Sequence, residues 1–407
     1  MTESRQPVHT VFGGAHLFRA DVVERFRSLA TASIDTYASD ASEFREAFGI
    51  ASPDLAERVY ARVREKLQRE AIEDYRIDFE DGYGAREDAE EDGHAVAAAR
   101  EVAAAMAAGT LPWRVGIRVK SFGESERARS ERTLRLFLKT LIDTGGRLPE
   151  RFIVNLPKVS VVAEVEEFDR LLSACEREHG LEDGSIGLEV MVETPGIVLA
   201  ADGRSPLPGL LNVGKTRVGG AIFGAYDFTS ALGIAASQQS LRHPACDFAR
   251  NMMLVALAGS WVQLSDGATA VLPVAVHAAP KGGALTPAQR DENRRGVHAA
   301  WRIHRDNVRH AMSCGFYQGW DLHPAQLVSR YAATYEFFIE GLEPAAARMK
   351  NFVAKSAQAT RVGTAFDDMA TARGLGNHFR RALNSGAITQ AEMDALLGYS
   401  TQLIQSR

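Results

Sequence analysis

Short apolar segments alternate with long amphipathic stretches along most of this chain, and this alternation constrains the fold more than any other feature. Three of the intervening stretches, 86–108, 131–143 and 245–263, carry apolar residues at helical spacing or are dense in Ala and Glu. Eight strands that alternate with helices in a chain of 407 residues are typical of a (β/α)8 barrel. The eight segments with the length and composition of strands are 9–14, 75–81, 114–120, 152–158, 186–193, 218–227, 270–277 and 316–321.

A doubly wound open sheet is the competing arrangement for alternating strands and helices. Dinucleotide-binding versions of that fold carry a Gly-x-Gly-x-x-Gly turn between the first strand and the first helix. The sequence that follows the first predicted strand has no such motif. The barrel is therefore the favoured prediction, and its active site is expected at the carboxyl ends of the strands.

Two regions fall outside the barrel repeat. Residues 40–69, between the first two predicted strands, look like an inserted helical pair, and residues 331–407 are helical in character. We therefore expect a barrel domain over residues 1–330 and a C-terminal helical extension over residues 331–407. Several apolar residues of the extension have no obvious partner within the chain, which predicts a homo-oligomer: Tyr335, Phe337, Phe338, Phe352 and Val353.

The net charge and the cysteine content limit the partners and the cellular compartment that we expect for this protein. The formal net charge of −5 argues against nucleic acid or an anionic membrane surface as the main partner. Cys175, Cys246 and Cys314 are scattered without metal-ligand spacing, which fits a reducing compartment. The first residues have no apolar core of signal-peptide type, and no apolar run approaches the ~20 residues that span a bilayer. We expect a soluble cytoplasmic protein.

Two successive predicted strands end in a single carboxylate. Residues 186–193 close on Glu193 before a Thr-Pro-Gly break, and residues 218–227 close on Asp227. A buried acid is costly unless it is paired or binds a cation. The pair therefore predicts either a site for a hard divalent cation or an acid–base pair.

Other ionisable residues follow the remaining predicted strands. They are mostly acids and cations, with no Ser or Cys in a catalytic pattern, which suits a divalent cation and a carboxylate or carbonyl substrate better than acyl-enzyme chemistry. These residues are Glu80, Asp81, Arg118, Lys120, Lys158, His277, Asp321 and His323.

Each of these residues also has a purely structural interpretation. Glu193 could pair with an arginine, Asp227 could cap the helix that follows it, and Arg118 could be an ion-pair partner of Glu80. Asp78 shares a strand face with Glu80 by alternation, so one of the two is expected to be structural. His277 fits a packed histidine better than a ligand, and His323 fits an anchor of the last loop as well as a substrate contact.

Six short motifs, in this order along the chain, resemble those of a known family. They are 78–81 (Asp-Phe-Glu-Asp), 117–119 (Ile-Arg-Val), 156–158 (Leu-Pro-Lys), 192–194 (Val-Glu-Thr), 224–227 (Gly-Ala-Tyr-Asp) and 322–326 (Leu-His-Pro-Ala-Gln). The chain is similar over roughly residues 9–330 to the aldolase and citrate-lyase β-subunit family. That family includes malyl-coenzyme A lyases and pyruvate-dependent class II aldolases. The insertion at 40–69 and the long C-terminal tail are not part of the common pattern.

The resemblance implies roles for particular residues. Glu193 and Asp227 would hold Mg²⁺ or Mn²⁺, and Arg118 would bind the carboxylate or enolate oxygen of the substrate. Glu80 and Asp81 would lie beside the metal through water, with Asp81 or a metal-bound water as the base. The additional substrate-binding residues are predicted to be Lys158 and His323.

The resemblance also implies an activity, which we expect to be Mg²⁺-dependent carbon–carbon lysis. The substrate is expected to be a small hydroxy-carboxylic acid or its coenzyme A thioester, cleaved through a metal-stabilised enolate. Three alternatives remain open: a thioester hydrolase that acts on a malyl-coenzyme A-like substrate at the same metal site, a Schiff-base aldolase that uses Lys158, and a binding module without activity. Acids near Lys158 would raise its pKa, so we favour an electrostatic role for this lysine.

Overall fold

Eight parallel strands close into a barrel in the computed structural model. The structure describes residues 5–214, 216–359 and 369–398. Side chains are described for all of these residues except 353–359 and 369–372. Each strand pairs with its neighbours in chain order, and β8 pairs with β1 to close the sheet. The predicted (β/α)8 barrel is confirmed. The strands are β1 (His9–Gly14), β2 (Asp74–Asp78), β3 (Arg114–Arg118), β4 (Phe152–Leu156), β5 (Gly187–Val192), β6 (Val218–Phe223), β7 (Gln263–Ala268) and β8 (Gln318–Asp321).

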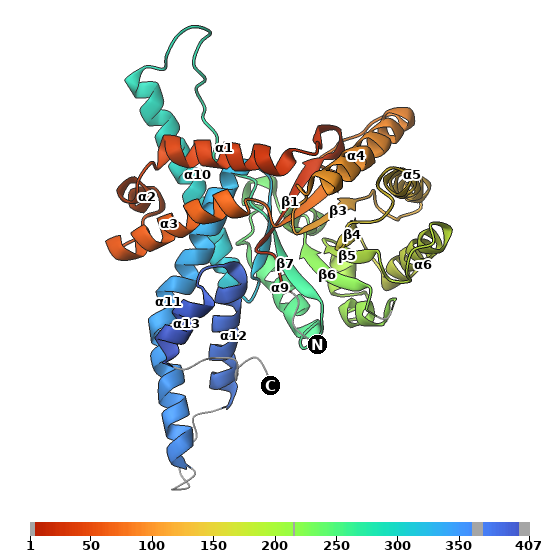
Figure 1. Cartoon of the computed structure of the whole chain (residues 1–407). Coiled ribbons are helices and arrows are strands. Elements are labelled where there is room, and N and C mark those ends of the chain that lie inside the picture. The colour runs from red at the N-terminus through yellow and green to blue at the C-terminus, as the bar shows by residue number, and fades with distance from the viewer. Residues whose placement is uncertain (1–4, 215, 360–368, 399–407) are drawn as a thin grey trace.

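Helices surround the barrel and extend beyond it (Figure 1). The predicted helices at 86–108 and 131–143 correspond to α4 and α5. The helices are α1 (Val22–Tyr37), α2 (Ala41–Phe48), α3 (Pro53–Arg69), α4 (Asp88–Ala108), α5 (Arg127–Gly145), α6 (Val162–Glu178), α7 (Pro195–Val198), α8 (Ala225–Ala231), α9 (Pro244–Ala256), α10 (Pro287–Ser313), α11 (Pro324–Ala359), α12 (Met369–Ser385) and α13 (Gln390–Leu397).

The barrel interior contains a buried ionic network. Arg76 on β2 is fully buried, and its Nε donates to Glu189 Oε2 on β5 at 3.1 Å. Its two terminal nitrogens donate to the carboxylate of Asp74. Asn155 on β4 donates to the same oxygen of Glu189 at 3.1 Å. These strands are therefore joined across the interior by charges that cannot reach water.

An apolar layer lies beside this network. Phe12, Met191 and Ile222, from β1, β5 and β6, form a buried cluster against which Trp320 of β8 packs. Successive residues of a strand point to opposite faces, so Met191 shares the inward face of β5 with Glu189, and Glu193 follows in the same register. The layer therefore separates the ionic network from the carboxyl ends of the strands.

Replacing Arg76 with Leu should destabilise the barrel strongly. Buried Glu189 would lose its cation, whereas Asp74 would keep its pair with Arg114, and breaking a buried pair costs about 3–5 kcal/mol. The exposed pair of Lys139 and Asp143 provides the control, because Lys139→Leu removes a surface contact that contributes about 1 kcal/mol at most. Urea unfolding measures both variants, and an unchanged midpoint for Arg76→Leu would contradict a structural role for the network.

The predicted seventh strand is wrong. Residues 270–277 form no strand, and β7 lies earlier, at Gln263–Ala268. The apolar residues of the predicted segment are exposed, with fractions between 38% and 68% for Val271, Leu272, Val274 and Val276. The true strand reads Gln-Leu-Ser-Asp-Gly-Ala, and its Asp266 is paired with buried Arg250 of α9. The polar composition of β7 hid a strand whose buried carboxylate is paired with an arginine of the preceding helix, α9.

Two further corrections follow from the position of β7. The helix predicted over 245–263 ends at Ala256, and Gly259, whose φ is +71°, lies in the turn that leads to the strand. His277 is not at a strand end. Its backbone NH donates to Asn293 Oδ1, and its ring contacts Glu292, both on α10. The structure therefore places His277 in a loop contact with α10.

The predicted helical insertion at 40–69 consists of α2 and α3, which pack against α10 and α11. The Phe48 ring stacks on Trp301 of α10 at a centroid distance of 5.3 Å, and Tyr331 of α11 donates to the carbonyl of Ala71. Helix α11 runs without interruption past the barrel, and α12 and α13 lie beside its distal part (Figure 1). The predicted boundary at residue 330 falls within α11, and the division into two domains stays a prediction.

Three of the five apolar residues named for the extension, Tyr335, Phe337 and Phe338, have partners within the chain, contrary to expectation. Tyr335 and Phe338 are buried, and Phe338 packs against Tyr317 and against His378 of α12. Phe337 is partly buried against the same core. The side chain of Val353 lies outside the described residues. A homo-oligomer stays a prediction, but Tyr335 and Phe338 supply no surface for it.

No helix in the described part of the chain combines the length and the apolar character that crossing a membrane requires.

Candidate active site

The carboxyl ends of the parallel strands meet at one edge of the barrel, where most of the predicted site residues lie. Arg118 is the last residue of β3, and Glu193 follows the last residue of β5. Asp227 lies in the first turn of α8, after β6 has ended at Phe223. The residue that caps α8 is Gly224, so the interpretation of Asp227 as a helix cap is wrong.

Asp78 is the residue that holds Arg118 in place. Its carboxylate accepts a hydrogen bond from Arg118 Nε at 2.7 Å and another from Nη2 at 2.5 Å. The same carboxylate accepts from the backbone NH groups of Glu80 at 2.9 Å and Gly82 at 2.7 Å. Asp78 therefore fixes both the guanidinium and the loop that carries Glu80 and Asp81. Of Asp78 and Glu80, Asp78 has the structural role.

Arg118 keeps one nitrogen free of hydrogen bonds. Its guanidinium is buried and rests against Phe12 and Trp320, whose ring centroids lie 5.0 and 5.1 Å from its Cζ. Nη1 has no hydrogen-bond partner, although Glu80 Oε2 lies 3.3 Å from it. A buried donor without a partner favours a ligand that accepts from it. The ion pair between Arg118 and Glu80, which was the structural interpretation of Arg118, is present but is secondary to the pair with Asp78.

Glu193 is held by an unusual backbone conformation at Lys158. The backbone NH of Lys158 donates to Glu193 Oε1 at 2.6 Å. Lys158 has a φ of +54°, the single positive value at a non-glycine residue in the described ranges. This left-handed conformation costs about 1 kcal/mol or more for a side chain with a Cβ. In this conformation the backbone NH of Lys158 points toward Glu193 Oε1.

The Lys158 side chain points to a different pair of acids. Its Nζ donates to Glu80 Oε1 and to Asp81 Oδ1, the latter at 3.1 Å. Burial opposes its charge, but Glu80 and Asp81 together raise the pKa of Lys158 above its usual value. A lysine must lose its proton to form a Schiff base, so this environment is unfavourable to covalent catalysis by Lys158.

The pKa values of Glu193 and Asp227 are both raised. Burial and then the neighbouring Asp227 carboxylate raise the pKa of Glu193 to about 8, against the charge of Arg118 and the NH of Lys158. Burial also raises the pKa of Asp227, with Asp81 adding to the effect and Lys158 opposing it. Within the described residues, the Asp227 side chain makes no hydrogen bond or ion pair. Both carboxylates would be stabilised by a bound cation.

Glu80 and Asp81 have pKa values that are displaced in opposite directions. Burial raises the pKa of Glu80, despite Arg118 and Lys158 nearby. Burial disfavours ionised Asp81 as well, but hydrogen bonding with Glu80 and the two cations lower its pKa overall. Two adjacent carboxyl groups with separated pKa values are an arrangement suited to acid–base catalysis.

The residues fit a hard divalent cation bound by Glu193 and Asp227. Both donors are carboxylate oxygens, the ligands that Mg²⁺ and Mn²⁺ prefer. The pKa of Glu193 is raised first by burial and then by the Asp227 carboxylate, and a bound cation would favour its ionised form. No three carboxylates here bring oxygens within 4.8 Å of one another in the part of the chain that the structure describes. Two direct protein ligands would leave the remaining coordination positions open to water and substrate.

Replacing Gly224 with Ala should displace Glu193. A Cβ at Gly224 would lie 2.4 Å from Glu193 Oε2 and 2.5 Å from its Cβ, whereas the φ of −103° accommodates alanine. We expect Mn²⁺ affinity to fall about tenfold or more, measured by electron paramagnetic resonance. Gly219→Ala, on the strand β6 that precedes Gly224, is the matched control, because the nearest atom to its Cβ would be 4.0 Å away. Equal affinities for the two variants would contradict the assigned position of Glu193.

The remaining predicted residues lie at the same edge or behind it. His323 begins the turn into α11, where its Nδ1 accepts from the backbone NH of Ala325 at 3.2 Å, and burial lowers its pKa. Asp321 points outside the barrel, where it pairs with Arg330 and His304. Lys120 lies 3.6 Å from Glu91 of α4. The structure therefore brings Glu80, Asp81, Arg118 and Lys158 together, with Glu193 and Asp227 beside them, and gives His323 a loop-anchoring contact.

Several contributors to the site were not identified from the sequence. Phe12 and Trp320 support Arg118 from β1 and β8, and Gly224 leaves space for Glu193. Strand alternation indicated that Asp78 or Glu80 would be structural, but it could not show which. The positive φ of Lys158 has no signal in the sequence, because non-glycine residues rarely adopt it.

Comparisons with known proteins identify the family and support the fold. A citrate lyase from Burkholderia xenovorans LB400 is similar in structure, with 21% identity, a TM-score of 0.56, and coverage of 84% of this chain and 92% of that chain. Haloferax volcanii malate synthase matches at 14% identity and a TM-score of 0.49, over 96% of this chain and 95% of that one. No protein of curated function matches the sequence. The family model of DUF6986, a domain of unknown function, matches residues 1–407, and the chain therefore belongs to that family.

Proposed function

We propose that the protein is a Mg²⁺-dependent carbon–carbon lyase of the aldolase or acyl-coenzyme A lyase type. The observation that carries the proposal is the position of two mutually repelling carboxylates, Glu193 and Asp227, near a buried arginine whose Nη1 makes no hydrogen bond. The fold, which is shared with a protein solved as a citrate lyase, is compatible with the proposal. The substrate is a small hydroxy-carboxylic acid, either free or as its coenzyme A thioester.

Arg118 binds and orients the substrate in this proposal. Its Nε and Nη2 are fixed by Asp78, so Nη1 presents its free N–H groups in a defined direction. A guanidinium remains charged at all working pH values and matches the geometry of a carboxylate. The contacts with Phe12 and Trp320 exclude water from one side of the guanidinium, which strengthens its electrostatic attraction for an anionic group.

Glu80 and Asp81 move the protons. Asp81 is half-exposed and has the lowered pKa, so it is the ionised group that accepts the proton of the substrate hydroxyl. The hydroxyl carbon then becomes a carbonyl, and the cleaved bond leaves its electron pair on the carbon beside the acyl carbonyl. A proton returned from the carboxyl pair quenches that carbon. Bound Mg²⁺ supplies Lewis-acid stabilisation of negative charge on substrate oxygens.

The test is a cleavage assay with metal-free protein to which Mg²⁺ is restored. A panel of 3-hydroxy and 4-hydroxy acids and their coenzyme A thioesters serves as substrate, and carbonyl products and free thiol are measured separately. The proposal predicts a carbonyl product that depends on Mg²⁺. Thiol release without a carbonyl product would contradict it and favour thioester hydrolysis. Borohydride trapping with pyruvate should leave Lys158 unlabelled, because its paired ammonium is unreactive.

A further inference from the structure

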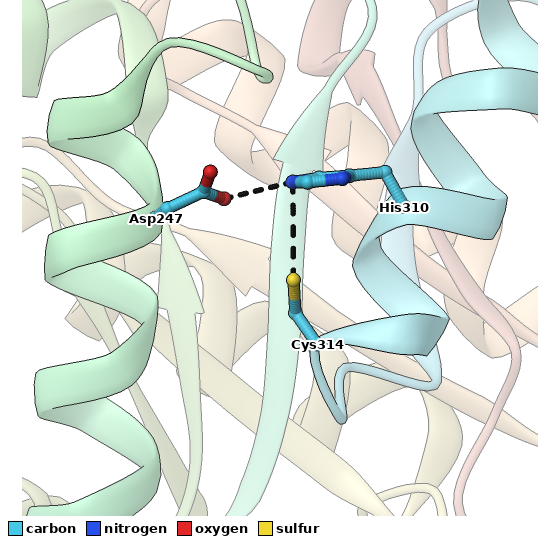
Figure 2. A group of neighbouring side chains, drawn as sticks. All are labelled: Asp247, His310 and Cys314. Atoms are coloured by element: carbon cyan, nitrogen blue, oxygen red, sulfur yellow. Dashed lines mark hydrogen bonds and ion pairs between the residues drawn. The ribbon is translucent and has the colours of Figure 1, made fainter.

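Three side chains of metal-binding type meet on the outside of the barrel, between α9 and α10 (Figure 2). Asp247 lies in the first turn of α9, His310 in the last turn of α10, and Cys314 immediately after α10. One potential ligand atom from each lies within 4.8 Å of the other two. Within the described ranges, these residues form the one group of three or more His, Cys, Asp and Glu side chains that meets this criterion.

The imidazole of His310 is the centre of the group. Its Nε2 lies 2.8 Å from Asp247 Oδ1 and 3.8 Å from Cys314 Sγ, and Figure 2 shows both side chains directed at this nitrogen. A tetrahedral Zn²⁺ with ordinary bond lengths separates its nitrogen and oxygen ligands by about 3.3 Å and its nitrogen and sulfur ligands by about 3.5 Å. Small rotations of the three side chains would therefore reach the geometry of a zinc site.

The carboxylate of Asp247 has capacity for a cation despite its contact with Arg250. Arg250 Nη2 donates to Asp247 Oδ1 at 2.7 Å, but Arg250 is also paired with buried Asp266 at 2.8 Å. Asp247 Oδ2 makes no hydrogen bond within the described residues. Burial disfavours the ionised form, yet the hydrogen bonds from Arg250 and His310 hold the pKa of Asp247 below its usual value. The carboxylate is therefore ionised at neutral pH.

The donor atoms select the class of metal. An imidazole nitrogen and a thiolate sulfur are poor ligands for Mg²⁺ but suit Zn²⁺, and one carboxylate oxygen is a common third ligand. All three side chains are partly exposed, so a fourth position is accessible to water. We infer that Asp247, His310 and Cys314 form a Zn²⁺ site that joins α9 to α10. Binding releases the thiol proton of Cys314 to solvent and requires the lone pair of His310 Nε2.

The inference is independent of the proposed lyase activity, because none of the three residues belongs to the candidate active site. Co²⁺ is the probe, since a cobalt–thiolate bond gives a near-ultraviolet charge-transfer absorption that carboxylate ligands do not. The full chain is titrated with Co²⁺ in the presence of a phosphine reductant and excess Mg²⁺. The Mg²⁺ occupies sites made of carboxylates alone. Zn²⁺ is then added to displace the Co²⁺. We expect one equivalent of the thiolate absorption, removed by Zn²⁺.

The variants assign the absorption to particular residues. Cys314→Ser should remove it, and His310→Gln should lower the Co²⁺ affinity by at least about 100-fold. Cys246→Ser is the matched control, because Cys246 lies on α9 next to Asp247 but donates its thiol to the carbonyl of Ser240. It should retain the absorption, with circular dichroism confirming that each variant is folded. Absence of the band in wild-type protein, or its persistence in Cys314→Ser, would overturn the inference.

Discussion

Glu193→Gln should abolish Mg²⁺-dependent cleavage, with a loss of about 1,000-fold or more, corresponding to about 4 kcal/mol of transition-state stabilisation. The amide keeps the size of the side chain and can still accept from the NH of Lys158, but it lacks the charge that attracts the cation. The measurement is the cleavage rate as a function of Mg²⁺ concentration. Glu182→Gln, the same change at an exposed position, is the control and should match wild type. Full activity of Glu193→Gln at any Mg²⁺ concentration would contradict the proposed ligand.

The raised pKa of Glu193 also predicts how Mg²⁺ affinity and stability change with pH, including the sign of each change. The pKa of Glu193 rises from 4.5 to about 8, so protons compete with the cation throughout this window. Apparent Mg²⁺ affinity should therefore increase about tenfold per pH unit up to pH 8 and then level off. Without metal, the raised pKa means that the folded state retains a proton that the unfolded state has lost. The free energy of unfolding should then fall as pH rises through the window, by at most about 1.4 kcal/mol per unit.

The Glu193→Gln variant tests whether Glu193 itself causes the pH dependence of stability. In Glu193→Gln, the decline in stability of the metal-free protein between pH 4.5 and 8 should be reduced, because the amide does not titrate. The comparison uses urea unfolding of metal-free protein at several pH values. Identical pH profiles for wild type and Glu193→Gln would show that the carboxylate is not buried against Asp227 as described.

Arg118→Lys should lower kcat/KM by about 100-fold to 10,000-fold. Lysine retains the positive charge but has no planar fork, so it cannot donate two bonds to Asp78 and also present a fixed donor to the substrate. The loss should appear mainly in kcat if Arg118 orients the reacting group, and in KM if it contributes to ground-state binding alone. The rate with the preferred substrate of the panel is the measurement. Wild-type kinetics in this variant would contradict substrate recognition by Arg118.

Arg118→Met distinguishes the catalytic role from the structural one. It leaves Asp78 buried without its ion-pair partner, which should cost about 3–5 kcal/mol of stability in addition to the loss of activity. Arg132→Met is the control, because Arg132 is exposed and its pair with Asp92 lies on the outside of the barrel. Stability is compared by urea unfolding. Arg118→Lys, which retains a cation beside Asp78, should be less destabilised than Arg118→Met.

The barrel could be predicted from the sequence because parallel strands buried on both faces are short apolar runs, and seven of the eight predicted segments coincide with or overlap a strand. The seventh failed because Asp266 is tolerated in β7 only through its pair with Arg250. That pairing is tertiary and leaves no local signal. The exposed run at 270–277 had the more strand-like composition, yet Pro273 cannot donate to a ladder.

The candidate site was predictable to the extent that strand ends determine it. Counting residues to the ends of β2 to β5 was sufficient to bring Glu80, Arg118, Lys158 and Glu193 together, because parallel strands share one carboxyl edge. The contacts that orient these groups were not predictable. The choice of Asp78 as the partner of Arg118 and the left-handed backbone at Lys158 depend on three-dimensional packing.

The most direct test is a crystal of the full chain grown with Mn²⁺, with anomalous diffraction data collected at the manganese edge. The account predicts one strong anomalous peak within bonding distance of carboxylate oxygens from both Glu193 and Asp227, at the carboxyl ends of β5 and β6. A well-ordered site in which these two carboxylates share no ion, or in which manganese binds elsewhere on the chain, would contradict it.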